Sequence, residues 1–260
     1  MKVIMLGNQK GGVAKTTTAF ELSYLFATEG YKTLMIDLDA QCNLTTGCLK
    51  EKPDPKKNIS NILMGAVYVL DAIVPVRNGL DIIPGSPNML AERYTGRDDM
   101  YLLSDMRSTL EEETDYEYLI FDVGPQAGTI MNMALYASDY VITPANADDF
   151  SRDGVIRMAS DINNGKKHIK DFNVKFLGVL LTDMTATNVA KDEKKMFAAL
   201  SERLGAPIFN SQITHSCIVT EAKSRKKALN EYRPGSAQAG QYYDFAEEVL
   251  ERIEKGGHKK

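Results

Sequence analysis

The chain has 260 residues, of which 43% are hydrophobic and 25% are charged, and its formal net charge is −4. This length and apolar content are sufficient for the buried core of one α/β domain. Because the overall charge is negative, the molecule as a whole does not attract nucleic acid, and any DNA contact needs a local basic patch. Three scattered cysteines and three scattered histidines predict neither a disulfide framework nor a metal site, and they fit a reducing cytoplasm. No stretch approaches the roughly 18 apolar residues of a membrane span, so we expect a soluble, unprocessed protein.

Six apolar runs of strand length alternate along most of the chain with longer segments that are compatible with helices. Several of these runs show little polar alternation, which is typical of strands buried on both faces. We therefore predict an α/β fold in which helices cover both faces of a mostly parallel, twisted sheet. A single domain is expected over residues 1–255, followed by a disordered tail at residues 256–260. The predicted strands are residues 3–6, 33–36, 80–83, 118–121, 140–143 and 176–181.

The first predicted strand is followed at once by a glycine loop and by a helix that is expected to start at Thr16. Residues 10–17 of this segment read Lys-Gly-Gly-Val-Ala-Lys-Thr-Thr. Adjacent glycines let the backbone turn its amides inward, and the start of the helix adds a partial positive charge. Lys15 can neutralise the β- and γ-phosphate oxygens of a nucleotide, and the Thr16 hydroxyl can bind Mg²⁺. The pattern therefore predicts a phosphate site formed by Gly11, Gly12, Val13, Ala14, Lys15, Thr16 and Thr17.

The loop is a variant of the usual P-loop pattern, because Gln9 and Ala14 stand where that pattern has glycine. It also contains a second lysine, Lys10, which a loop that serves one nucleotide through one lysine does not require. The alternative interpretation is a solvated turn that carries a surface lysine. The strand before the loop and the threonine-rich helix start after it favour phosphate binding.

Two helices are predicted from apolar side chains at helical spacing. One follows the glycine loop and ends at Gly30, and the other finishes within residues 247–260. Residues 50–58 are charged and contain two prolines, which predicts a surface excursion within the domain. The apolar faces consist of Phe20, Leu22, Leu25 and Phe26 in the first helix and of Phe245, Val249, Leu250 and Ile253 in the second.

The pattern Lys-Gly-Gly-x-x-Lys-Thr resembles the deviant Walker A loop of the ParA/MinD class of P-loop ATPases. Residues 33–45 are similar to the second motif of the ParA branch, in which an apolar strand is followed by Asp-x-Asp and then by Gln-x-Asn-x-Thr. Residues 118–122 resemble the Walker B strand of the class. The resemblance covers most of the chain, and it implies the three-layer sandwich of a P-loop NTPase with ATP and Mg²⁺ as cofactors.

The resemblance also implies roles for the acidic residues that follow two of the strands. Thr16 would bind Mg²⁺ directly, while Asp37 and Asp122 would hold metal-bound waters. Asp39 would orient the attacking water. If strand geometry persists, Asp37 and Asp39 project from one face at the carboxyl end of the sheet, where ligands of open α/β folds bind. The alternative for this pair is a solvated turn after a strand.

Lys10 is the residue whose implied role depends on a second subunit. In the class that the chain resembles, this lysine crosses a symmetric interface and contacts the phosphates bound by the partner, as an arginine finger does. ATP would then hold a homodimer together. Because ADP lacks the γ-phosphate, hydrolysis should loosen the pair and make a switch that depends on the bound nucleotide.

The chain departs from the family pattern at two positions near the expected γ-phosphate. Gly124 stands where relatives usually have the first of two prolines, so this loop is expected to be more flexible. Ala14 carries a steric penalty if it must adopt a positive φ. For the adenine, the resemblance implies contacts from two loops, one at Asp183 and one at Phe209 and Asn210.

A short basic segment follows a helix start predicted at residues 216–222, and it is the candidate DNA-binding patch. Its cations are Lys223, Arg225, Lys226 and Lys227. A second cluster of Lys166, Lys167 and Lys170 could supplement it. Relatives often carry an arginine where this chain has Thr214 and His215, so the DNA surface is expected to be weaker or differently placed. The alternative is a solvated helical face, which is the usual role of a charge run.

Taken together, the resemblance implies a Mg-dependent ATPase of weak basal activity that acts in plasmid or chromosome partition. It would bind nucleoid DNA without sequence preference as an ATP homodimer, and a ParB-like centromere-binding partner would stimulate hydrolysis. Such a protein is cytoplasmic, associated with the nucleoid and not with a membrane.

Three other interpretations are weighed against this one. A MinD-type membrane-associated division-site ATPase needs an amphipathic C-terminal helix, whereas this tail ends in small and polar residues. An ATP-driven electron donor with a shared iron–sulfur cluster needs two suitably placed cysteines, but the sequence has none between Cys48 and Cys217. A nucleotide-binding scaffold that scarcely hydrolyses ATP is separated from the first interpretation only by measuring turnover.

Overall fold

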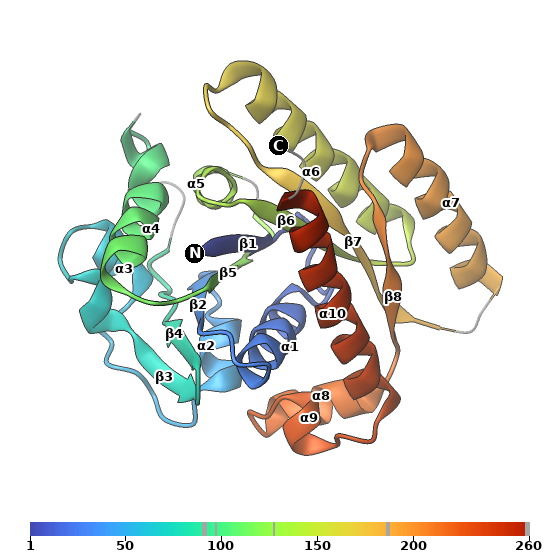
Figure 1. The fold of residues 1–260 in the computed structure, drawn as a ribbon, viewed down its shortest axis with the longest axis horizontal. Coiled ribbons are helices and arrows are strands. Elements are labelled where there is room, and N and C mark those ends of the chain that lie inside the picture. Colours follow the sequence, from blue (N-terminus) through green and yellow to red (C-terminus); the bar gives the residue numbers. More distant parts are fainter. Residues whose placement is uncertain (90–92, 97, 127, 186–187, 258–260) are drawn as a thin grey trace.

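The computed structural model describes residues 1–89, 93–96, 98–126, 128–185 and 188–257, and these residues contain one eight-stranded sheet with helices around it (Figure 1). The strand order is β3-β4-β2-β5-β1-β6-β7-β8. Every neighbouring pair is parallel except β3 and β4. The predicted α/β fold with a mostly parallel sheet is therefore confirmed. The strands are β1 (Lys2–Leu6), β2 (Thr33–Leu38), β3 (Val74–Arg77), β4 (Leu80–Ile83), β5 (Tyr118–Val123), β6 (Tyr140–Asn146), β7 (Lys175–Met184) and β8 (Ile208–Thr214).

The helices fill the connections between the parallel strands, as the spacing of the apolar runs predicts. Two short 3₁₀ helices, Val69–Ala72 and Asp98–Tyr101, lie between β2 and β5 in the chain. The α-helices are α1 (Lys15–Thr28), α2 (Asn43–Cys48), α3 (Ile59–Leu63), α4 (Leu102–Glu113), α5 (Thr129–Tyr136), α6 (Asp149–His168), α7 (Asn188–Leu204), α8 (Cys217–Ser224), α9 (Leu229–Tyr232) and α10 (Ala237–Gly257).

Successive residues of β1 point into two different cores, one on each face of the sheet. Ile4 and Leu6 pack in the core that contains residues of α1 and α10. Val3 and Met5 pack in the core that contains residues of α4, α5 and α6. Because both faces are buried, apolar side chains are favourable at every position of the central strands, which explains their unbroken apolar sequence.

All six predicted strands are present, but the sheet has two further strands that the pattern did not predict, one at each edge. β3 has only four residues and includes Pro75, which cannot donate a backbone hydrogen bond. In β8, residues of strand character are interrupted by the polar side chains of Asn210, Ser211 and Gln212. Short or polar edge strands do not give the continuous apolar run of a buried strand, so sequence pattern alone is a poor guide to them.

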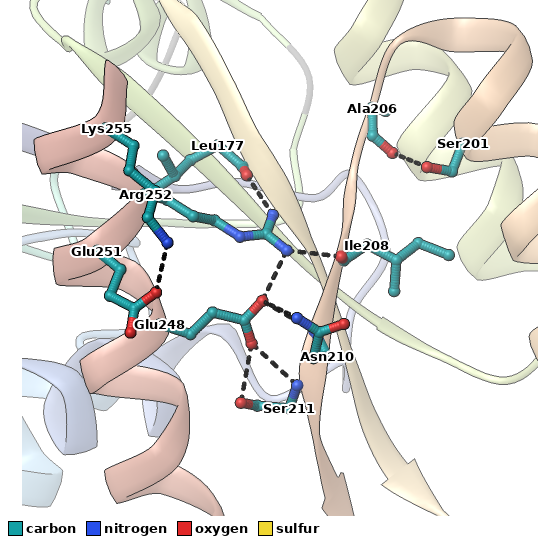
Figure 2. Close-up of polar contacts among 10 residues, drawn as sticks. All are labelled: Leu177, Ser201, Ala206, Ile208, Asn210, Ser211, Glu248, Glu251, Arg252 and Lys255. Carbon is teal, nitrogen blue, oxygen red and sulfur yellow. Dashed lines mark hydrogen bonds and ion pairs between the residues drawn. The ribbon is translucent and has the colours of Figure 1, made fainter. Parts of the chain in front are cut away.

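Side chains of α10 fix β8 in place, as Figure 2 shows. The Glu248 carboxylate accepts hydrogen bonds from the backbone N–H groups of Asn210 and Ser211 at 2.9 and 3.0 Å. Arg252 donates to the carbonyl oxygen of Ile208 at 2.7 Å and to Glu248 at 2.7 Å. These α10 side chains and the backbone that they bind are called the β8 clamp below. They occupy backbone groups at an edge strand that would otherwise be open to pairing with another chain.

The last helix, α10, extends past the boundary predicted between the domain and its tail. The helix continues through Gly257, two residues beyond the expected end of the domain at residue 255. Residues 258–260 of the predicted tail lie outside the described residues. Phe245, Val249 and Ile253 are buried in the core shared with α1, so they are packed on the domain as the sequence suggested. In the described part of the chain, none of the helices combines the length and the apolar character that crossing a bilayer requires.

Candidate functional site

The glycine loop connects β1 to α1 at the carboxyl edge of the sheet, and α1 begins at Lys15, one residue before the predicted start. Gly12 has a φ of +78° and Ala14 a φ of 61°, so both adopt the left-handed conformation. For Ala14 this is the steric penalty that the sequence raised as a question. Ala14 is also the N-cap residue, and its methyl group cannot accept a hydrogen bond from the first turn. The amide groups at the start of α1 are therefore suited to an anion.

A pocket of about 570 Å³ lies against this loop and reaches across to the carboxyl ends of β7 and β8. Most residues of the predicted phosphate site line it, but Lys10 and Val13 do not. Its walls include one face of α8, whose residues recur at helical spacing. The pocket is lined by Gly11, Gly12, Ala14, Lys15, Thr16, Thr17, Asp39, Gln41, Asn43, Pro125, Thr182, Asp183, Ile213, Thr214, His215, Ser216, Val219, Thr220, Lys223 and Tyr242.

Lys15 is nearly buried beneath the glycine loop, and its Nζ donates a hydrogen bond to the carbonyl oxygen of Lys10 at 2.7 Å. Burial lowers the pKa of the Lys15 ammonium, while the negative charges of Asp122 and Asp39 oppose this shift. The side chain thus lies beneath the loop, close enough to Asp122 and Asp39 for their charges to act on it. This is the position from which a lysine can neutralise a phosphate bound at the start of α1.

Asp122, near the end of β5, is 1% exposed, and neither of its carboxylate oxygens has a hydrogen-bond partner among the described residues. Burial raises the pKa of its carboxyl, and the charge of Asp37 adds to this shift, whereas Thr16 and Lys15 oppose it. Asp122 stands opposite Asp37 in the parallel register of β5 and β2. The Thr16 hydroxyl is near enough to affect this carboxylate but does not form a hydrogen bond of ordinary geometry with it, and the two groups together are a donor set that fits Mg²⁺ or a metal-bound water.

Asp37 is fully buried on β2, but its carboxylate is already engaged by the protein. One oxygen accepts hydrogen bonds from the backbone N–H and the hydroxyl of Thr45 at 2.9 and 2.7 Å. The other accepts the N–H of Asp39 at 3.2 Å. Burial raises the pKa of Asp37, and the Thr45 donors work against this shift. In this structure the side chain anchors α2, and a role toward metal-bound waters stays a prediction.

Asp39 lines the pocket, and its Oδ1 accepts the N–H of Gln41 at 3.0 Å. Gly124, which stands where relatives usually have proline, lies directly beside it. A Cβ atom on Gly124 would be 3.0 Å from Asp39 Oδ1, which is tighter than an ordinary contact. The glycine therefore gives the Asp39 carboxylate room, and this close approach is a physical reason for a residue without a side chain at position 124.

Lys10 points away from this pocket, toward the start of α6. Its Nζ donates to Asp148 Oδ2 at 2.5 Å and to Ser151 Oγ at 3.2 Å. Its backbone N–H donates to the side chain of Asn8 at 2.9 Å, and the fully buried Asn8 donates to the carbonyl oxygen of Pro144 at 2.8 Å. Lys10 is thus held within its own subunit in this structure. The role toward a partner's phosphate stays a prediction.

Of the residues predicted near the adenine, Asp183 lies at the pocket and Phe209 and Asn210 do not. Asp183 adopts a φ of 56°, and its carboxylate is 2.6 Å from Nδ1 of His215. Both residues line the pocket at the carboxyl ends of β7 and β8. Sequence reasoning missed His215 as a site residue, because its position depends on where β8 ends.

Phe209 and Asn210 lie near the beginning of β8 and not in a loop as expected, and their contact with adenine stays a prediction. Phe209 is buried, with its ring centroid 4.9 Å from that of Phe245. Asn210 belongs to the β8 clamp, where its side chain and backbone both donate to Glu248 (Figure 2). β8 continues to Thr214, so the chain reaches the pocket edge of the sheet only there.

The basic segment after α8 does not act as one uniform patch. Lys223 lines the nucleotide-sized pocket and is at the same time exposed. Arg225 stacks on the ring of Tyr232 at 4.8 Å, and Lys226 donates to the carbonyl oxygen of Lys50 at 3.4 Å. Arg225 and Lys227 are exposed and remain accessible to a partner.

The second basic cluster, Lys166, Lys167 and Lys170, lies at and just after the end of α6. α6 packs on one face of the sheet through Met158 and Ile162, whereas the basic segment belongs with Ala222 and Leu229 to the other face. The two clusters therefore do not form one continuous surface.

The chain is similar to known proteins over nearly its whole length. A family model described as an AAA domain matches residues 1–175. The sporulation initiation inhibitor protein Soj of Bacillus subtilis is 31% identical over 256 residues, which are 95% of this chain and 98% of Soj. The chromosome partitioning protein ParA of Caulobacter vibrioides is 29% identical over 97% of this chain and 95% of its own length. The cobyrinic acid a,c-diamide synthase of Mycobacterium smegmatis, solved with bound ADP and magnesium, has the same fold, with a TM-score of 0.81 and 24% identity over 98% of this chain and 96% of the synthase chain.

Proposed function

The chain belongs to the ParA/Soj family of P-loop partition ATPases, and we propose that it is a Mg-dependent ATP hydrolase whose ATP-bound homodimer binds DNA without sequence preference. In this proposal it drives plasmid or chromosome segregation together with a ParB-like centromere-binding partner. The observation that carries the proposal is the unsatisfied, buried carboxylate of Asp122 beside Thr16 and the uncapped start of α1. Such a site is complete only when an anion and a cation are bound together.

In the proposed site, the backbone of the glycine loop and the start of α1 bind the phosphates, and Lys15 neutralises their charge. Thr16 would bind Mg²⁺ directly, and Asp37 and Asp122 would hold metal-bound waters; the ion would supply further charge neutralisation. Asp39 is the residue of this chain that orients and polarises the attacking water. Its carboxylate lies in the pocket wall, with room left by Gly124.

Lys10 supplies the dependence on a second subunit. Its ammonium would reach the phosphates held by the partner, so that ATP occupancy favours pairing and hydrolysis reverses it. The DNA contact rests on the exposed cations of the basic segment, above all Arg225 and Lys227, because non-specific binding needs only charges that reach the phosphate backbone. Association with nucleoid DNA in the cytoplasm follows from that contact.

The test is the Lys10→Ala variant, studied by sedimentation with ATP and with ADP. We expect the parent protein to pair with ATP and not with ADP, and the variant to remain monomeric while it still binds nucleotide. Lys57→Ala removes an exposed lysine outside the pocket and is the matched control. A Lys10→Ala protein that pairs with ATP as the parent does would refute the crossing role. Turnover of the parent, measured with DNA and a partner, distinguishes an ATPase from a scaffold that scarcely hydrolyses ATP.

A further inference from the structure

Asp148, the N-cap residue of α6, makes two contacts that have different consequences. Its Oδ1 accepts the backbone N–H of Ser151 at 2.8 Å, which caps the helix. Its Oδ2 accepts the ammonium of Lys10 at 2.5 Å. The first contact stabilises local structure, whereas the second ties the helix to a loop residue 138 positions away in the chain.

The backbone of Lys10 is fixed independently of its side chain. Its N–H donates to Asn8 and its carbonyl oxygen accepts from Lys15 at 2.7 Å. The Lys10 side chain can therefore change its partner without a change in the glycine loop. The side chains of Lys10 and Asp148 are 26% and 37% exposed, so water can replace either of them when the ion pair opens.

The ion pair stabilises the charged forms of Lys10 and Asp148, and the proposed contact of Lys10 with a partner's phosphate requires these two charges to separate. Burial opposes ionisation of Asp148, but the hydrogen bonds from Lys10 and Ser151 outweigh it and lower the pKa of this carboxyl. An ammonium that reaches a partner's phosphate must leave this carboxylate first. In a symmetric pair, the same ion pair opens once in each subunit.

We propose that Asp148 is a positioning residue that holds the Lys10 ammonium inside its own subunit and thereby sets the ATP concentration at which the protein pairs. This inference rests on the proposed function, and it concerns how the availability of Lys10 to the partner subunit is regulated. A partly exposed ion pair shifts an equilibrium by a factor of about two to five. Two such ion pairs open and two ATP molecules bind for each dimer that forms, so removal of Asp148 should lower the ATP concentration for half-maximal pairing by the factor for one ion pair, about two- to fivefold.

The decisive variant is Asp148→Asn, because asparagine is as good an N-cap as aspartate but lacks the charge. The concentration of a non-hydrolysable ATP analogue that gives half-maximal pairing is measured by sedimentation, and we expect it to fall about two- to fivefold. Asp153→Asn removes one charge from an exposed position of the same helix and should leave this concentration unchanged. A second readout does not depend on pairing: Lys10 should react faster with an amine-acetylating reagent in the Asp148→Asn monomer, as quantified by mass spectrometry. A residue with a merely structural role would move neither readout in these directions.

Two results would overturn the inference. An unchanged concentration for pairing means that Asp148 does not restrain Lys10, and a higher one means that Asp148 orients Lys10 toward the partner instead. If the asparagine variant does not fold, Asp148→Ser keeps a capping oxygen and is measured in the same way. If the parent itself fails to pair with ATP, the proposed function fails. If the parent pairs with ATP and the Asp148 variants pair at the same concentration as the parent, the proposed function stands and this inference alone fails.

Discussion

The β8 clamp and the region of the nucleotide pocket both remove charged side chains from full contact with water, but they differ in the hydrogen-bond partners that they give to these charges. In the clamp, Glu248 accepts hydrogen bonds from Asn210, Ser211 and Arg252, and Arg252 in turn donates to backbone carbonyl oxygens (Figure 2). At the pocket, the carboxylate of Asp122 has no partner among the residues that the structure describes. A charge that serves only the fold is neutralised within the fold, whereas one that serves a ligand is left for the ligand to neutralise.

This difference predicts that the two regions respond oppositely to removal of a charge. Removal of a charge from the clamp should destabilise the protein and leave ligand binding unaffected. Removal of the charge from the pocket should stabilise the unliganded protein and abolish its chemistry, because functional sites keep unfavourable groups that the ligand compensates.

The largest effect is expected for Asp122→Asn. ATP turnover should fall about 100-fold or more, because the variant lacks a carboxylate that the proposed function assigns to the metal site. At pH 8 the free energy of unfolding of the nucleotide-free protein should rise by ~1–2 kcal/mol, because a buried carboxylate without donors is replaced by a neutral amide. Turnover assays and urea denaturation measure the two effects. A variant that is less stable than the parent would contradict the view that Asp122 is kept for a ligand.

The next effect is expected in the clamp. Glu248→Ala should lower the free energy of unfolding by ~2–3 kcal/mol, because it leaves the Arg252 guanidinium and two backbone N–H groups of β8 without their acceptor. Nucleotide affinity, measured by calorimetry under conditions where the variant is folded, should not change. Glu251→Ala is the control: this exposed neighbour pairs only with Lys255 in Figure 2, and its removal should cost less than ~1 kcal/mol.

A pH-dependent effect on stability is expected at Glu21, a buried carboxyl on α1 that has fewer hydrogen-bond donors than Glu248. Both of its oxygens accept the single backbone N–H of Leu229, at 3.0 and 3.1 Å, and burial raises its pKa to about 8. The folded protein therefore keeps a proton that the unfolded chain releases near the ordinary glutamate pKa of 4.5. The contribution of Glu21 to stability is present at low pH and declines as the pH rises toward about 8.

The Glu21→Gln variant lacks this titration. The unfolding free energy of the parent relative to the variant should fall by up to ~1.4 kcal/mol per pH unit between about pH 5 and pH 8, and should then level off. Urea denaturation across that range gives the difference, in which groups common to both proteins cancel. A difference that stays constant with pH would show that Glu21 is ionised in the folded protein.

The smallest effect concerns the two basic clusters. Charge reversal of Arg225, Lys226 and Lys227 should weaken DNA binding in the presence of ATP. It should also reduce the slope of log affinity against log salt by about one for each DNA phosphate that the protein no longer neutralises. The same reversal at Lys166 and Lys167, on the other face of the sheet, should leave the slope unchanged. If the first variant binds DNA as tightly as the parent, the basic segment is not the DNA surface.

The sequence was sufficient to predict the central strands and the glycine loop, because both depend on local requirements. Strands buried on both faces need continuous apolar residues, and a phosphate loop needs residues such as Gly12 that tolerate a positive φ. Asp39 follows β2 and lines the pocket, and Asp122 stands opposite Asp37 near the carboxyl ends of β5 and β2. Edge strand β8 was missed, since its side chains bind to α10 and are not required to be apolar.

The rest of the site depends on tertiary packing. The end of β8 at Thr214 fixes the position of His215, and the orientation of α8 brings Lys223 to the pocket. Neither is encoded in a short motif. The partners of Asp37 are likewise tertiary: Thr45 follows eight residues later, and only the geometry of the turn into α2 directs its hydroxyl to the carboxylate. The same Asp-x-Asp spacing would fit a carboxylate that faces solvent.

The packing of α10 against α1 has a consequence for folding during synthesis on the ribosome. The buried hydroxyls of Thr18 and Tyr242 lie 3.4 Å apart, although 224 residues separate them in the chain. At ribosomal speeds of about 5–20 residues per second, roughly 10 to 45 s pass between the synthesis of these two residues. During that interval the apolar face of α1 lacks the cover that α10 provides in the finished protein, so this core can be completed only after the last helix has been synthesised.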